Sequence, residues 1–213
     1  MNEQNNELYI TRSFNINEFR AIDDNKNKRI EGYPVIFNSS TDIGGYFFER
    51  IERGAFDECD LSDVLFFVNH DCNKIPLARS RKTGNSTMKL SVEEKGLFIS
   101  ADLDVENNQD ARSLHSAVAR GDIDGMSFAF RIKEQRWENL DSKQPTRIIT
   151  KFAKVFEVSA VNNPAYKDTD ISARDKVALE NAKNIVEDVR NKKENNSLEI
   201  ERLRTQILLK INK

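Results

Sequence analysis

The sequence contains few of the residues that crosslink a chain or bind metal ions. Its 213 residues include two cysteines, Cys59 and Cys72, two histidines, four prolines and one tryptophan. Two cysteines at this spacing form neither a metal-ligand motif nor a disulfide framework, which is typical of a reducing compartment. We therefore expect no metal, no cofactor and no disulfide.

Long hydrophobic runs and an excess of charge of either sign are also missing. The longest apolar run, Val64 to Val68, is far shorter than the roughly 20 residues that cross a bilayer. The first six residues lack the basic region and the apolar core of a signal peptide. Lys plus Arg number 33 and Asp plus Glu number 35, giving a net charge of −2, whereas nucleic-acid binders present a basic surface. The sequence thus predicts cytosolic synthesis and neither a membrane nor a nucleic-acid partner.

The hydrophobic pattern changes its period near residue 173. Before this point, short β-branched or aromatic segments with a period of two are bounded by Gly, Asn or Asp, which is typical of strands. Lys95-Gly96 indicates a hairpin turn in which Gly96 supplies a positive φ, and Pro34 indicates an edge strand or a strand end. The expected strands cover residues 29–37, 88–92, 97–103, 126–133, 147–150 and 156–161.

Helical signals interrupt these strands at two places. Asn107 or Asn108 can cap a helix that ends at Arg120 with a cation and at Gly121 with a C′ glycine. A second, shorter helix is expected from residue 54 to 59. We therefore expect residues 1–172 to form one mainly β domain with flanking helices, of the α+β class.

The last 41 residues, 173–213, contain neither glycine nor proline. Apolar residues recur there at spacings of three and four, with an interruption at Asn195-Asn196-Ser197, which predicts one interrupted helix or two helices. Because the apolar stripe is narrow, a partner is favoured over packing on the chain's own domain. The second predicted unit is thus a helical tail that binds a partner or acts like a scaffold, with self-association as one form of this binding.

Four side chains before the tail are candidates for chemistry. His70 ends an apolar strand beside Asp71, where it is either a polar turn residue or a general base. His115 lies inside a predicted helix and is interpreted as structural. Ser127 faces away from the apolar side of its strand beside the small Ala129, a position that is commonplace for a serine but also open to a nucleophile.

Glu157 is the fourth of these side chains, because apolar residues flank it on both sides. A buried carboxylate needs a partner. That partner is either an arginine, such as Arg131 or Arg147, or an imidazole that the carboxylate orients. Asp71 competes for the second role, although an immediate neighbour of His70 reaches the same ring with difficulty.

Six motifs then give a resemblance that covers about residues 10 to 173. They are Gly32-Tyr33-Pro34-Val35-Ile36-Phe37, Glu49-Arg50-Ile51-Glu52-Arg53-Gly54-Ala55-Phe56, Asn69-His70-Asp71, Gly125-Met126-Ser127-Phe128-Ala129-Phe130, Glu157-Val158-Ser159-Ala160-Val161 and Pro164-Ala165-Tyr166. In this order they resemble the prohead (capsid maturation) serine protease family of tailed bacteriophages. Pro34 stands where the family commonly has a small residue.

The resemblance implies a fold and a set of catalytic residues. The fold is similar to that of herpesvirus assemblin, a closed or partly open β-barrel flanked by helices. By resemblance His70 is the general base, Ser127 the nucleophile and Glu157 the third member of the catalytic set. An oxyanion hole is required, and the turn at Asn162 and Asn163 is one candidate.

The expected function is that of a serine endopeptidase inside an assembling procapsid in the host cytoplasm. Its partners would be the major capsid protein and a scaffold protein or scaffold-like segment, which it would cleave, together with itself. The alternative from another class is a non-catalytic assembly factor that acts through the helical tail. A third hypothesis, an unrelated β-barrel binding module, predicts no reaction with a fluorophosphonate probe.

Overall fold

The computed structural model describes residues 10–15, 18–24, 27–139 and 142–162, and residues 184, 187–188, 190–191 and 197–203 of the tail. The strands and the helix of the main body lie within the first four of these ranges. In chain order they are β1 (Ile10–Asn15), β2 (Arg20–Asp24), β3 (Asn27–Ile36), β4 (Ser40–Ile43), β5 (Phe47–Ile51), β6 (Asp63–Val68), β7 (Ala78–Arg81), β8 (Met88–Val92), β9 (Gly96–Asp102), α1 (Gln109–Arg120), β10 (Gly125–Glu138) and β11 (Thr146–Val161).

Strand pairing gives two sheets. The larger has the order β1-β10-β11-β5-β4, with β6 also paired to β11 and β7 to β6, and the smaller has the order β2-β3-β9-β8. The pairings among the described residues do not close into a ring, so the mainly β, α+β architecture is confirmed but a closed assemblin-like barrel is not.

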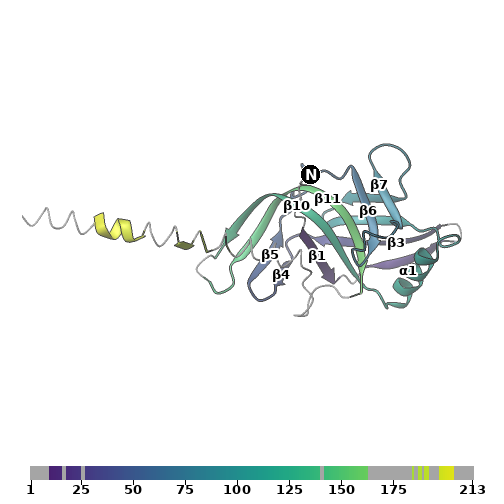
Figure 1. Cartoon of the computed structure of the whole chain (residues 1–213), viewed down its shortest axis with the longest axis horizontal. Coiled ribbons are helices and arrows are strands. Elements are labelled where there is room, and N and C mark those ends of the chain that lie inside the picture. Colours follow the sequence, from purple (N-terminus) through teal and green to yellow (C-terminus); the bar gives the residue numbers. More distant parts are fainter. Residues whose placement is uncertain are drawn as a thin grey trace, which may run out of the picture.

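The hairpin of β10 and β11 forms the centre of the larger sheet. Both strands are long and strongly curved, and they arch across the molecule in Figure 1. The first part of β11 pairs in parallel with β5 and its last part pairs in parallel with β6. The two strands predicted at 147–150 and 156–161 are therefore one continuous strand, whose last part carries residues 157–160 beside β6.

Phenylalanines pack the core beneath this hairpin. Phe152 of β11 makes edge-to-face contacts with Phe128 and Phe130 of β10, with ring centroids 5.7 and 4.9 Å apart. Such pairs add stabilisation beyond the burial of apolar area. Met126, Phe128 and Phe130 are fully buried in the main core cluster, which confirms that the side of β10 opposite Ser127 is apolar.

Helix α1 forms as its end signals predict. The Asn108 side chain accepts hydrogen bonds from the N–H groups of Asp110 and Ala111, and Gly121 adopts the left-handed conformation at φ 78°. Ala111, Leu114 and Val118 form its buried face. The short helix expected at residues 54–59 is wrong: this segment is a series of turns.

Two other local predictions concern Gly96, where the physical reason is wrong, and Pro34. Gly96 does not have a positive φ; it is required because a Cβ there would lie 1.8 Å from the Val35 carbonyl oxygen of the neighbouring strand. Pro34 lies near the end of β3, past Glu31 where the pairing with β2 ends, and at a register shift between Gly32 and Val35 in the pairing with β9, so the expected edge position near a strand end is confirmed. A bulge accommodates a proline that a regular ladder would exclude.

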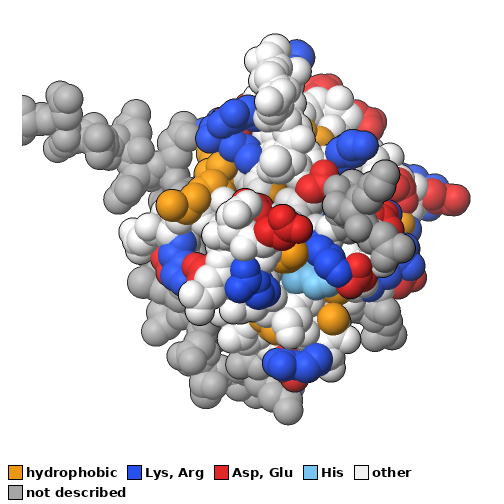
Figure 2. All heavy atoms as spheres, turned by 90° about the vertical axis from the view of Figure 1, so that its right-hand side faces the viewer, with side chains coloured by type: hydrophobic (Ala, Val, Ile, Leu, Met, Phe, Trp, Pro, Cys, Tyr) orange, Lys and Arg blue, Asp and Glu red, His pale blue; other side chains and the backbone are white. Residues whose placement is uncertain are grey.

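Two further features are the described part of the tail and the molecular surface at the α1 end. Residues 197–203 are helical, with Leu198, Ile200 and Leu203 more than half exposed, but most of the predicted tail and the boundary at residue 172 lie outside the described residues. Figure 2 shows the face at the α1 end, where acidic and basic side chains are interspersed and hydrophobic side chains appear only in small separate areas.

Candidate active site

The site is assembled by the pairing of three strands. Ser127 of β10 is aligned with Ser159 of β11, and Glu157 lies two residues before Ser159 on the same strand. Strand β6 runs parallel on the other side of β11, with Phe67 aligned with Ser159, and His70 follows two residues after its end. Strand register thus brings together His70 and Ser127, which are 57 positions apart in the sequence, and Ser127 and Glu157, which are 30 positions apart.

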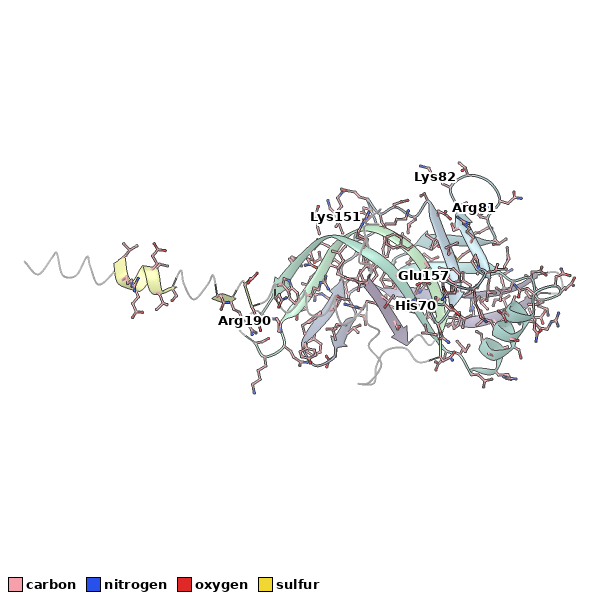
Figure 3. The ribbon with its side chains drawn as sticks, in the orientation of Figure 1. His70, Arg81, Lys82, Lys151, Glu157 and Arg190 are labelled. Atoms are coloured by element: carbon pink, nitrogen blue, oxygen red, sulfur yellow. The ribbon has the colours of Figure 1, made fainter. Side chains whose placement is uncertain are left out.

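The three predicted side chains form one hydrogen-bonded row. His70 Nε2 lies 2.6 Å from Ser127 Oγ, and His70 Nδ1 contacts Glu157 Oε1 in a short hydrogen bond. Figure 3 shows His70 and Glu157 side by side at the same end of the molecule as α1. An ionised carboxylate only accepts hydrogen bonds, so the proton of a neutral imidazole belongs on Nδ1 and Nε2 is left as the acceptor that faces the serine.

Ser159 extends this hydrogen-bonded row on the far side of Glu157 from His70 Nδ1. Its Oγ donates to Glu157 Oε2 at 2.6 Å, and it accepts a hydrogen bond from the His70 backbone N–H at 3.3 Å. The Glu157 side chain is only 4 % exposed, and Ser127 and Ser159 are fully buried. Each oxygen of the buried carboxylate therefore has a partner, which offsets the cost of removing it from water.

The turn after β6 holds His70 in an uncommon backbone conformation. Asn69 and His70 both have positive φ, 52° and 59°, a region in which asparagine and histidine are enriched among non-glycine residues. The Asn69 N–H donates to the Ala160 carbonyl, and its side-chain Oδ1 accepts from the Asn162 N–H. The turn is thereby fastened to the end of β11, the strand that carries Glu157.

Ser127 has a second hydrogen-bond acceptor close to it. Its Oγ lies 2.9 Å from the carbonyl oxygen of Arg12 on β1, the strand that pairs with β10 on the side away from β11. A carbonyl oxygen only accepts, and the hydroxyl has a single proton. The Arg12 carbonyl and His70 Nε2 therefore compete for the proton that a general base must remove.

A buried ion network anchors β1 next to the site. Arg12 Nε lies 2.6 Å from Glu49 Oε1, and Arg147 Nη1 lies 3.2 Å from Glu49 Oε2. Burial alone would raise the pKa of Glu49, but the two guanidinium groups outweigh it and hold that pKa below its ordinary value. The network joins β1, β5 and β11, and so fixes the strand whose carbonyl contacts Ser127.

The other candidates from the sequence have different contacts. Asp71 accepts a hydrogen bond from the Asn73 N–H, and the partner at His70 Nδ1 is Glu157. Arg147 binds Glu49 and Gln135. His115 lies 3.2 Å from the Ile22 carbonyl oxygen, a structural contact.

Two parts of the site differ from the sequence predictions. The N–H of Asn162, one of the two oxyanion-hole candidates, donates to Asn69 Oδ1, and Asn163 lies outside the described residues. Ser159 is not among the sequence candidates, although its place two residues after Glu157 puts both side chains on one face of a strand.

Neither metal ligands nor a membrane-spanning element is found in the described part of the chain. No group of three or more His, Cys, Asp or Glu side chains there is arranged to hold a metal ion. No helix among these residues has the length and apolar character needed to cross a bilayer.

Comparison with known proteins gives the family. The model of the caudovirus prohead serine protease family matches residues 16–184, so the chain belongs to this family. The family implies a serine peptidase that takes part in capsid maturation, inside the assembling procapsid of the host cell. No curated protein and no solved structure gives a significant match.

Proposed function

We propose that this chain is a serine endopeptidase in which Ser127 is the nucleophile, His70 the general base and Glu157 the residue that orients His70. The observation that carries the proposal is the row Glu157–His70–Ser127, with 2.6 Å between His70 Nε2 and Ser127 Oγ. The family match supports the reaction class. The substrates proposed are the capsid protein, a scaffold protein or scaffold-like segment, and the chain itself.

The proposed reaction follows acyl-transfer chemistry. His70 Nε2 takes the proton of Ser127 as Oγ bonds to the carbonyl carbon of the scissile peptide. The carbon–nitrogen bond then breaks, and His70 gives its proton to the leaving amine. Water, activated by the same imidazole, hydrolyses the acyl-enzyme and restores Ser127. Glu157 holds the ring and stabilises the imidazolium in both halves of the reaction.

The test compares wild type with Ser127→Ala by mass spectrometry after incubation alone and with capsid protein. Wild type should yield discrete fragments and react with a fluorophosphonate probe on Ser127, whereas the variant should do neither. Because the members of such a unit act together, nearly all of the acceleration should be lost. Unchanged processing by Ser127→Ala would refute the proposed nucleophile.

A non-catalytic role in assembly is the second candidate. The exposed Ile200 and Leu203, three residues apart on the helical residues 197–203, favour it, because apolar side chains at helical spacing suit a partner helix. Under this hypothesis Ser127→Ala would still support shell formation, while replacement of both apolar residues by serine would prevent it.

A further inference from the structure

We infer that the pocket between α1 and the turn after β6 binds an apolar side chain of the peptide substrate, an inference that rests on the proposed function. The pocket has a volume of about 250 Å³. Pockets that enclose small-molecule ligands are larger, at roughly 300–1,000 Å³. A single amino-acid side chain is therefore the better match for its size.

The position of the pocket connects it to the reacting groups. Val68 and Asp71, which line it, flank the turn that carries His70, and Ile123 lines it four residues before Ser127. Phe67, another lining residue, is aligned with Ser159, which is aligned with Ser127. Aligned residues of neighbouring strands point to the same face of the sheet, so this wall of the pocket lies on the face that carries the nucleophile.

The lining decides which side chain it accepts. Phe67, Leu77, Leu114, Ala117 and Ile123 form an apolar wall. Lys74 and Asp110 also line the pocket and form an exposed ion pair of 3.1 Å with each other. A charged substrate side chain would lose water at an apolar wall, whereas an aliphatic or aromatic one gains free energy from burial there.

A variant of α1 tests this inference with a matched control. Ala117→Leu fills the pocket from its helix wall, while Ala119→Leu places the same side chain on the exposed face of α1. Cleavage of a peptide library by wild type should favour a large apolar residue at one substrate position. Ala117→Leu should lower kcat/KM for those peptides about tenfold or more and shift the preference towards small residues, and Ala119→Leu should match wild type.

The outcomes distinguish a failure of the pocket assignment from a failure of the proposed function. If wild type cleaves no peptide and no fluorophosphonate reacts with Ser127, the proposed function fails. If wild type cleaves and Ala117→Leu keeps the same preference while folding normally, the pocket assignment fails. The rate of fluorophosphonate labelling should be equal in the two leucine variants, since a small probe does not need the pocket.

A separate observation concerns Ser159, which we propose as a positioning residue for the catalytic row. It is fully buried and contacts both Glu157 Oε2 and the His70 N–H. Its donated hydrogen bond fixes the rotation of the carboxylate so that Oε1 faces His70 Nδ1. Its accepted bond holds the backbone of the histidine turn, so one hydroxyl sets the orientation of two members of the row.

Kinetics of three variants test the role of Ser159. Ser159→Ala should lower kcat about tenfold to a hundredfold with little change in KM, the loss expected for one hydrogen bond to a charged group. Ser159→Thr and Ser159→Cys, which keep a donor of different strength and size, should recover activity in part. As the control, Ser13→Ala removes the hydroxyl of the β1 residue that is aligned with Ser127, and it should leave kcat within about twofold of wild type. A drop in folded fraction with unchanged kcat per folded molecule would overturn the proposal.

Discussion

Glu157 divides its two carboxylate oxygens between His70 Nδ1 and Ser159 Oγ. This division matters because an imidazole offers its free nitrogen to a serine only when its proton is held at the other nitrogen. A side chain that donated a hydrogen bond to His70 Nδ1 would favour the tautomer with its proton on Nε2.

Glu157→Gln therefore should abolish most of the activity without unfolding the protein. The glutamine amide can donate to Nδ1, which would move the imidazole proton to Nε2 and prevent it from acting as a base. The expected loss in kcat is roughly a thousandfold or more, by analogy with the wrong-tautomer effect in serine proteases. Active-site titration and thermal unfolding, measured together, check that the loss is catalytic; a variant within tenfold of wild type would contradict the proposed role.

Glu49 leads to a prediction about stability and pH. Its pKa is held below the ordinary value of 4.5, since Arg12 and Arg147 outweigh the effect of burial. A carboxyl group with a lowered folded-state pKa contributes stability above its unfolded-state pKa, and this contribution is lost as the pH falls through the folded-state value. The network should therefore stabilise the protein at pH 7 and fail in acid.

Glu49→Gln should lower the free energy of unfolding at pH 7 by about 3 kcal/mol, because two buried guanidinium groups lose their counter-charge. Below pH 4.5 the difference from wild type should shrink. Urea unfolding of both proteins at pH 7 and in acid measures this. A difference that is constant with pH would show that the charge of Glu49 is not the cause.

At the scale of elements, the helix and most strands could be predicted because their signals are local. Asn108 and Gly121 mark the ends of α1, and the period of two marks β8 and β9. The parallel pairing of β6 with β11 could not be predicted, because no local signal fixes which distant strands meet. The candidate catalytic residues came from a family resemblance; their meeting depends on this pairing.

Gly96 shows how a local signal can mislead about cause. Its neighbourhood indicated a turn, yet the glycine is needed because the Val35 carbonyl oxygen of β3 occupies the space of a side chain. Sequence alone contains no information on the approach of a strand that is 61 positions away.

Gly96→Ala should consequently separate β3 from β9 and cost about 2 kcal/mol or more, within the range for overpacking a core. Lys89→Ala on the exposed side of the neighbouring β8 is the matched surface control and should change stability by less than about 0.5 kcal/mol. Equal unfolding midpoints for the two variants in urea would argue against a close approach of β3 at this position.

At the scale of the whole molecule, the accessible surface near the row is small. The His70 side chain is 27 % exposed, while Ser127 is fully buried between β1 and β11. A peptide carbonyl must approach Ser127 Oγ within about 3–3.5 Å for attack. Because Ser127 is fully buried, we expect an open conformation to form before attack.

Urea well below the unfolding midpoint should therefore accelerate fluorophosphonate labelling of Ser127, since local opening becomes less costly before the protein unfolds. Far-UV circular dichroism over the same range verifies that the fold persists. A labelling rate that only falls with urea would indicate that the nucleophile is already accessible in the folded state.

Because Ser127 is buried, the opening equilibrium controls the onset of the proposed cleavage. The observed rate of cutting is the rate of the open form multiplied by its population, so each 1.4 kcal/mol in the opening equilibrium delays cutting about tenfold. In the proposed protease, the salt links that hold β1 beside Ser127 would thereby set when cutting begins, while the row Glu157–His70–Ser127 would set how fast it proceeds afterwards.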